Sequence, residues 1–265
     1  MFMEVRKHLK LIAKYFTFNL SALTEYRTSF LVQVFGMALN NASFAFFWWV
    51  LFDKIGTGIG GYGFQDVMFL WAVASTGFGI ASVLFSNTRR ISGMIMTGEL
   101  DTYLPQPKNP LINSMAARMS ASAWGDFLYG FILMVLIKAT LGMWLMFGIG
   151  IFTAALLMTA ITIAGHSLTF YFGNMEAVGG SLWEFTITFS IYPESIFTGP
   201  VKALIMSVIP IGFITHIPLR LAHDFNWGTF LLLIGVTIAY CLLAFALYMG
   251  GLKRYESGNL IITRM

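Results

Sequence analysis

Several long apolar runs without a charged side chain limit the fold of this chain more than any other feature. Residues 29–52 and 229–252 each run for 24 residues without Asp, Glu, Lys or Arg. A helix that crosses the hydrocarbon core of a bilayer needs about 20 such residues. Because 57% of the 265 residues are hydrophobic and only 11% are charged, a water-soluble fold could not cover so much apolar surface. The sequence therefore predicts an all-α integral membrane protein.

Six transmembrane helices fit the distribution of these runs. The stretch that would hold the third and fourth helices is too long for one helix, so we expect a hairpin that turns at Lys138–Gly142. Asn174, Glu176 and Glu184 are expected to lie in a polar loop before the fifth helix. The six helices are predicted at about residues 29–52, 67–85, 121–137, 143–167, 182–197 and 229–252.

Two further segments are apolar but are not expected to span the membrane. Residues 4–25 carry apolar side chains at three- and four-residue steps, with lysines on another face. This pattern predicts an amphipathic interfacial helix, and the alternative is a solvated leader. Residues 200–227 are interrupted by Pro200, Pro210 and Pro218. Because each apolar piece there is too short to cross, we expect an outer re-entrant hairpin before the last helix.

The positions of Lys and Arg predict the orientation. If both termini are cytoplasmic, 12 of the 16 Lys and Arg residues fall in cytoplasmic segments, and the other four are Lys54, Lys138, Lys202 and Arg220. Cytoplasmic loops carry the excess of Lys and Arg in membrane proteins. Both termini are therefore expected in the cytoplasm. The same clustering at the edges of apolar runs explains the net charge of +4 without a nucleic acid partner.

The sequence shows no pattern that indicates catalysis. It has no G-x-x-x-x-G-K-[ST] loop for nucleotide phosphates, no H-x-x-x-H or C-x-x-C spacing for a metal and no G-x-S-x-G elbow. We predict a chain that is not an enzyme, with no catalytic residue, metal or cofactor of its own. The predicted helices also hold almost no charged side chains, which argues against a transporter driven by an ion gradient.

Two adjacent amides stand out inside the first predicted helix. Asn40 and Asn41 lie near its middle, where an amide without a partner would be costly in lipid. At least one of them should therefore face another helix or a cavity. They are interpreted either as contacts between helices or as a polar patch on a substrate pathway.

The segment between the second and third predicted helices is the most distinctive polar stretch. Arg89 and Arg90 open a short amphipathic stretch that Gly98 ends. A second helical turn with Leu100 and Leu104 then stops at proline. A chain without its own energy source needs a rigid segment that a motor can push, and this one is a candidate. The alternative is a basic loop that only fixes the topology.

At this segment the chain resembles ABC-2-type permeases, the membrane subunits of many bacterial ABC exporters. Residues 98–107 match a subgroup pattern, G-E-L-D-x-Y-L-x-x-P. The subgroup also has a Tyr-Pro pair near the end of the fifth helix and a basic K-R-Y-x-S-G-N segment after the sixth. Tyr192-Pro193 and residues 253–259 supply both. The motifs occur in the same order on a six-helix frame over nearly the whole chain.

The resemblance implies a division of the chain and a set of partners. Residues 1–28 would form the interfacial connecting helix, 29–252 a six-helix permease domain and 253–265 a cytoplasmic tail. A coupling helix near residues 89–104 would dock on a separate ABC ATPase subunit, which holds ATP and Mg²⁺. Two permease subunits, identical or sister chains, would form the conduit in the bacterial cytoplasmic membrane. The residues implied in coupling are Arg89, Arg90, Gly98, Glu99, Leu100, Asp101, Leu104, Pro105 and Pro107.

Some questions stay open at this point. The coupling loop of this chain has fewer paired Arg and Glu residues than is usual, so individual salt bridges to an ATPase cannot be carried over. The cavity implied between the first, second and fifth helices would be lined by Phe, Met, Ser and Asn, which suits drugs, peptides and lipids equally. Two other functions remain: a secondary transporter or channel driven by an ion gradient, and an assembly subunit without transport.

Overall fold

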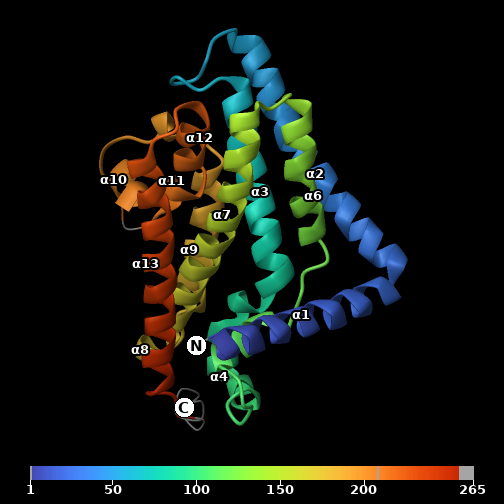
Figure 1. Ribbon diagram of the computed structural model, residues 1–265, viewed down its shortest axis with the longest axis vertical. Helices are drawn as coiled ribbons and strands as arrows, with labels where there is room; N and C mark the ends of the chain where they lie inside the picture. The colour runs from blue at the N-terminus through green and yellow to red at the C-terminus, as the bar shows by residue number, and fades with distance from the viewer. Residues whose placement is uncertain (1, 208, 257–265) are drawn as a thin grey trace.

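The computed structural model describes residues 2–207 and 209–256, and this part of the chain is a helical bundle without β-strands (Figure 1). The prediction of an all-α membrane protein is confirmed. The longer helices are α1 (Phe2–Glu25), α2 (Arg27–Ile55), α3 (Phe64–Phe85), α6 (Ala123–Leu136), α7 (Leu141–Ser167), α9 (Glu176–Ser190) and α13 (Trp227–Leu252).

Shorter helices connect the long ones. Between α3 and α6 lie η1 (Ser86–Arg90), α4 (Ile91–Thr97), η2 (Glu99–Thr102) and α5 (Pro110–Ala116). Between α7 and α13 lie α8 (Thr169–Phe172), η3 (Glu194–Ile196), α10 (Gly199–Ser207), α11 (Ile211–Ile214) and α12 (His216–His223). The region 200–227 is thus divided into short helices at its prolines, as its sequence predicts, and we call α10, α11 and α12 the cap.

In the described part of the chain, four helices are long and apolar enough to cross a membrane, and they differ in their surroundings. The most apolar windows of α3 and α7 are 83% and 78% buried, so these two helices form the centre of the bundle. The corresponding windows of α2 and α13 are only 6% and 17% buried, which leaves most of both helices to face lipid or another subunit. With 14 and 15 residues, α6 and α9 are shorter than a full crossing requires. The count of six spanning helices therefore stays a prediction.

The fifth helix differs from the predicted range of 182–197. It begins at Glu176 and ends at Ser190, so Glu176 and Glu184 belong to the helix and the predicted loop assignment of these two residues is wrong. Both side chains are exposed, so they sit on the helix surface without being buried in the bundle. Pro193 explains the early end, because a proline disfavours the α conformation in the residue before it.

The hairpin between α6 and α7 is confirmed. The turn contains Lys138, which has a left-handed backbone with φ 51°. The Thr140 side chain then caps α7 by accepting a hydrogen bond from the Met143 amide at 3.3 Å.

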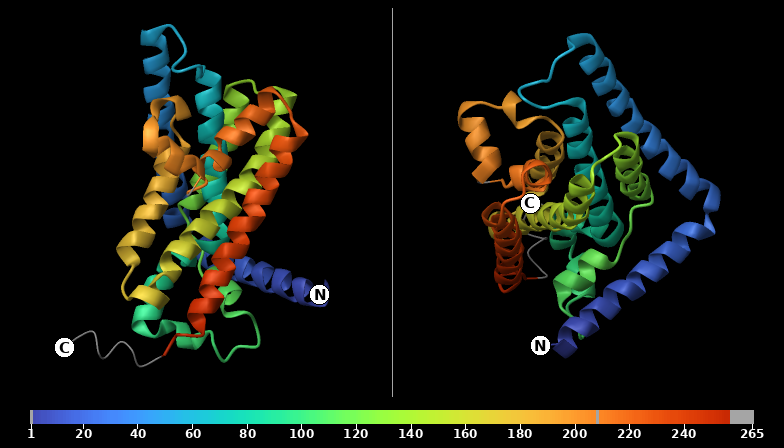
Figure 2. Two further views of the ribbon diagram at one scale, coloured as in Figure 1. Left: turned by 90° about the vertical axis from the view of Figure 1, so that its left-hand side faces the viewer. Right: turned by 45° about the horizontal axis from the view of Figure 1, so that its top comes forward.

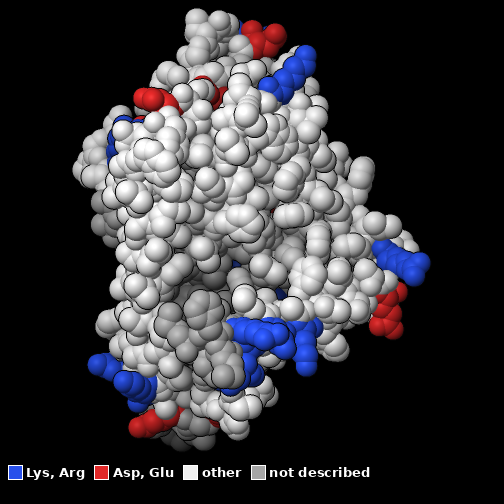
Figure 3. Space-filling view, in the orientation of Figure 1, with Lys and Arg blue, Asp and Glu red and all other residues white. Residues whose placement is uncertain are grey.

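The two ends of the bundle hold different sets of segments. The α2–α3 loop, the α6–α7 turn and the cap lie at one end, whereas α1, α4 and both ends of the described chain lie at the other (Figures 1 and 2). On the visible face, charged side chains gather toward these ends and leave a largely apolar band between them (Figure 3). Such a band is what lipid requires of a multi-pass membrane protein.

Helix α1 runs across the bundle instead of along it (Figures 1 and 2). Its Tyr15 hydroxyl donates a hydrogen bond to Asn113 at 2.7 Å, and its Phe16 ring lies 6.1 Å from the Trp124 ring. Other apolar side chains such as Phe18 remain exposed, at 71%. The helix is therefore fastened to the bundle on one face, which agrees with an interfacial helix better than with a solvated leader.

Candidate functional site

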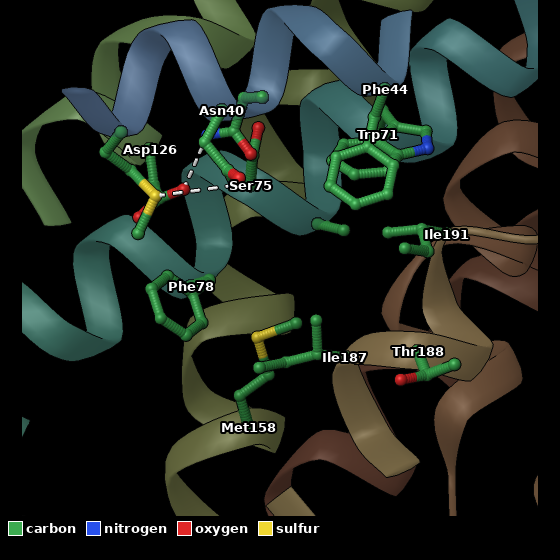
Figure 4. A pocket seen from close by; sticks show the side chains of 13 residues that line it. Asn40, Phe44, Trp71, Ser75, Phe78, Asp126, Met158, Ile187, Thr188 and Ile191 are labelled. Atoms are coloured by element: carbon green, nitrogen blue, oxygen red, sulfur yellow. Dashed lines mark hydrogen bonds between the residues drawn. The ribbon is translucent and has the colours of Figure 1, made fainter. Parts of the chain in front are cut away.

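A cavity of about 290 Å³ lies between five helices near the middle of the bundle (Figure 4). It includes the Phe, Met, Ser and Asn side chains that the sequence predicts for a substrate cavity. Helices α6 and α7 contribute to it, in addition to the three helices expected. The lining residues are Met37, Asn40, Asn41, Phe44, Trp71, Ala74, Ser75, Phe78, Asp126, Met158, Ile187, Thr188 and Ile191.

The two amides of α2 have different surroundings. Asn41 is 5% exposed, and its Nδ2 donates a hydrogen bond to Oδ1 of Asp126 in α6 at 2.7 Å. Asn40 is exposed and lines the edge of the cavity. The prediction that at least one amide faces another helix or a cavity is confirmed, because Asn41 joins two helices at the cavity wall. The interpretation as part of a substrate pathway stays a prediction.

Asp126 is the residue that the sequence interpretation missed. The expectation of almost no charged side chains inside the helices is wrong at this position, because Asp126 is 5% exposed in the first turn of α6. Its Oδ2 is buried and has no hydrogen-bond partner among the described residues. The only signal in the sequence was a single acidic residue near the start of the predicted span 121–137.

The backbone before α6 explains how this carboxyl group reaches the middle of the bundle. The segment between the end of α5 and the start of α6 is not helical. Within it, the Ser120 amide donates a hydrogen bond to the Ser82 carbonyl of α3 at 3.1 Å. Helix α6 consequently begins well inside the bundle (Figure 1). Next to Asp126, Gly125 lies so close to α2 that a Cβ atom there would be 2.5 Å from the Val34 carbonyl oxygen. This close approach brings Asp126 to Asn41.

Aromatic side chains form much of the remaining wall. The rings of Phe44 and Trp71 are stacked with their centroids 5.0 Å apart, and Phe78 packs against Trp183 at 5.2 Å. The Trp71 Nε1 atom is buried without a hydrogen-bond partner among the described residues. The cavity thus combines apolar rings with one acidic group.

The polar segment of residues 86–107 lies at the end of the bundle that also holds α1 (Figure 1). Helix α4 starts directly after Arg90 and ends at Gly98, whose φ of +76° is the left-handed conformation that glycine adopts readily. The second turn forms as the 3₁₀ helix η2, and Leu104 lies beyond it. The order of elements agrees with the sequence pattern.

The two arginines of this segment contact different groups. Arg90 forms a bidentate pair with Glu99, with N–O distances of 2.9 and 3.3 Å. The Arg89 guanidinium carbon lies 5.2 Å from the centre of the Trp183 ring in α9. Arg90 therefore holds the segment in shape, whereas Arg89 connects it to a neighbouring helix.

The other predicted residues of the segment divide into a buried set and an exposed set. Leu100 is fully buried in a cluster with Ile91 and Met94 of α4 and Tyr248 of α13. Asp101 is half-buried near Tyr255. The exposed residues form the tip of the segment and are Leu104, Pro105 and Pro107.

A buried hydrogen-bond network joins α4 to α7. The Ser92 hydroxyl lies 2.8 Å from His166 Nδ1, and the Thr169 hydroxyl donates to Ser92 at 2.9 Å. All three residues are buried. The segment is consequently fixed to the bundle by polar as well as apolar contacts.

At the opposite end, an ion pair and a hydrogen bond fasten the cap. Arg220 of α12 pairs with Glu194, which follows α9, and His223 Nε2 lies 2.7 Å from Asp66 Oδ1 in α3. His216 is buried beside them, with its ring 6.3 Å from Tyr62. Among the described residues, no group of three or more His, Cys, Asp or Glu side chains is arranged to hold a metal ion.

Comparison with known proteins places the chain in a family. Residues 38–258 match the family model described as ABC-2 family transporter protein. No curated protein and no solved structure matches the chain. The match covers most of the transmembrane bundle, all the cavity-lining residues except Met37, and the 86–107 segment. The chain therefore belongs to the ABC-2 family of transporters as a multi-pass membrane permease.

Proposed function

We propose that this chain is the transmembrane permease subunit of an ATP-driven ABC exporter and that it forms the substrate conduit as a dimer. Residues 89–107 would couple it to a separate ATPase subunit that holds ATP and Mg²⁺. Membership of the ABC-2 family supports the permease role. The direction of transport, the ATPase and the second permease subunit are parts of the proposal that follow from the resemblance.

The geometry of the 86–107 segment is the observation that carries the proposal. Its apolar side is buried in the bundle through Leu100, whereas its tip at Leu104 and Pro105 is exposed. A push on the tip would act on α7 through Ser92 and His166. A permease without its own nucleotide site needs a rigid contact of this kind.

The distribution of charge supports an orientation in the bacterial cytoplasmic membrane with both termini inside. The segments with most of the Lys and Arg residues lie at the end of the bundle that holds α1 and α4 (Figure 1). The remaining basic residues, such as Lys54 and Arg220, belong to segments at the cap end. This asymmetry is the one that orients membrane proteins.

Charge reversal at Arg90 tests the coupling. We expect the wild-type chain to co-purify with a P-loop ATPase, and the purified complex to carry out ATP-driven transport in vesicles. Arg90→Glu places two carboxylates side by side and should lower transport more than about tenfold by distorting the segment. Because the pair is local, the exchange Arg90→Glu/Glu99→Arg should recover part of the activity.

Lys54→Glu, at the far end of α2, is the matched control and should transport normally. Detergent extraction and helix content should be unchanged in every variant. Normal transport by Arg90→Glu would contradict the proposed coupling.

One observation favours a second function, a secondary transporter or channel driven by an ion gradient. Asp126 is an acidic group inside the bundle, and such groups often serve ion pathways. The test is flux into proteoliposomes that contain the chain alone, with an imposed proton or sodium gradient. Flux without an ATPase would support this second function and contradict the exporter.

A further inference from the structure

The carboxyl group of Asp126 is incompletely satisfied in either protonation state. Oδ1 accepts the hydrogen bond from Asn41, and the buried Oδ2 has no partner among the described residues. An ionised carboxylate would leave a charge without a counter-charge, and a protonated carboxyl would leave an O–H without an acceptor. Either condition costs free energy in a buried site. The site is therefore arranged for a partner that the chain does not itself supply.

The cavity beside Asp126 holds no basic residue. Its lining contains no Lys, Arg or His side chain among the described residues. Aromatic rings of Phe44, Trp71 and Phe78 form much of its wall. Aromatic faces attract cations, and a carboxylate with such rings is the usual arrangement for binding an organic ammonium group. The chemistry of the lining thus selects a positive charge on an apolar body.

The cavity has a lateral mouth between α2 and α9. Asn40 and Phe44 on α2 and Thr188 on α9 line the cavity and are also exposed. Trp71, Ser75 and Asp126 lie deeper, where the side chains are buried (Figure 4). The cavity is therefore open at the side of the bundle, and the carboxyl group belongs to its inner wall.

We propose that this cavity binds a monovalent organic cation with an apolar body, and that the positive charge pairs with Asp126. The volume of about 290 Å³ suits an amine with a single ring. The inference rests on the proposed transport function for its biological meaning, since it names the class of substrate. Asn41 would hold the carboxyl group in place, as a positioning residue.

Binding to the purified full-length chain in dodecyl maltoside, a detergent without charge or amino groups, tests this inference. The probes are radiolabelled phenylbutyl-trimethylammonium and its uncharged isostere with carbon in place of nitrogen. Saturable binding of the cation should be at least about tenfold tighter than that of the isostere, a difference of about 1.4 kcal/mol. Asp126→Asn should remove most of this preference, leaving only the part due to the aromatic rings, and should leave the binding of the isostere unchanged.

Two further variants keep the test decisive. Glu176→Gln removes an exposed carboxylate from α9 and should keep the full preference. Phe44→Leu changes a side chain at the mouth and should weaken binding of the cation about two- to fivefold, with little effect on the isostere. If Asp126→Asn cannot be purified, the wild-type comparison and Phe44→Leu decide.

Equal affinity of the wild-type chain for the two probes would overturn the inference, as would a preference of undiminished size in Asp126→Asn. The measurement needs no ATPase, so its outcome is separate from that of the proposed function. Binding of the cation without ATP-driven transport would contradict the exporter alone. ATP-driven transport without a preference for the cation would contradict the cation site alone.

Discussion

Pairs of polar and charged side chains connect different parts of the chain at the two ends of the bundle. Arg90 and Glu99 are nine residues apart and belong to one continuous segment. Arg220 and Glu194 are 26 residues apart, and His223 and Asp66 are 157 residues apart. The first pair gives one segment its shape, whereas the others join the cap to the rest of the bundle. The 86–107 segment is thus braced by a pair within itself, whereas the cap is joined by such pairs to segments distant in the sequence.

The Arg90–Glu99 pair and the Arg220–Glu194 pair also differ in how far their side chains are buried. The side chains of Arg90 and Glu99 are 42% and 34% exposed, so water reaches both partners. Glu194 has a side chain that is only 12% exposed, although Arg220 is 54% exposed. Removing a partner from a solvated pair costs little, whereas a buried carboxylate that loses its partner is costly. The stability of the protein should therefore depend more on the cap pair.

The largest expected effect on stability is that of Arg220→Met. This change leaves the Glu194 carboxylate buried without its counter-charge, and we expect a loss of about 2–3 kcal/mol in the free energy of unfolding. Arg90→Met should cost less than about 1 kcal/mol, because both partners are accessible to water. Unfolding by SDS titration in mixed micelles, followed by tryptophan fluorescence, measures both.

A double variant provides the control for this comparison. Glu194→Gln/Arg220→Met removes the charge that Arg220→Met leaves behind and should recover part of the lost stability. Equal losses for Arg220→Met and Arg90→Met would show that the two ends do not differ as described.

The next effect is a dependence on pH that arises in the cap. Burial lowers the pKa of His216 from its usual 6.5 to about 4, and the charges of Arg220 and Lys202 act in the same direction, while Glu194 opposes them. Between these pH values the unfolded chain binds a proton that the folded chain does not. Stability should therefore fall as the pH decreases from about 6.5 to about 4, by on the order of 1–3 kcal/mol.

His216→Gln should remove this part of the pH dependence. His8→Gln, in α1 at the other end of the molecule, is the matched control and should keep it. The same SDS titrations, repeated at several pH values, give the slope of the free energy of unfolding against pH. An unchanged slope in His216→Gln would assign the acid sensitivity to groups other than His216.

The sequence predicted those features that depend on local pattern. The α6–α7 turn at Lys138, the short helix that ends at Gly98 and the helical break at Pro210 all follow from neighbouring residues. The fifth helix was misplaced because Glu176 and Glu184 were assigned to a loop before it. Exposed Glu176 and Glu184 show that a helix at the edge of a bundle can carry charges on its outer face.

The cavity was predicted only in part, because its key contact is not local. Asn41 and Asp126 are 85 residues apart, and no pattern along the chain connects them. Their contact depends on the non-helical chain before α6, which lets the helix start inside the bundle, and on the close approach at Gly125. The sequence alone shows that Asn41 is unusual within an apolar helix. That Asp126 is its partner can be recognised only from the three-dimensional structure.

The smallest expected effect concerns Gly98 and tests whether the 86–107 segment is defined by its own backbone. With φ +76°, Gly98 is in a conformation that costs other residues about 1 kcal/mol, so Gly98→Ala should lower stability by about that amount. Gly93 is helical, and a Cβ there would meet no atom within 4 Å. Gly93→Ala should therefore be neutral or slightly stabilising.

Because Gly98 directs the chain so that Glu99 reaches Arg90, Gly98→Ala should reduce ATP-driven transport more than Arg220→Met does, despite its smaller cost in stability. The reverse order would mean that the cap, and not this segment, limits transport.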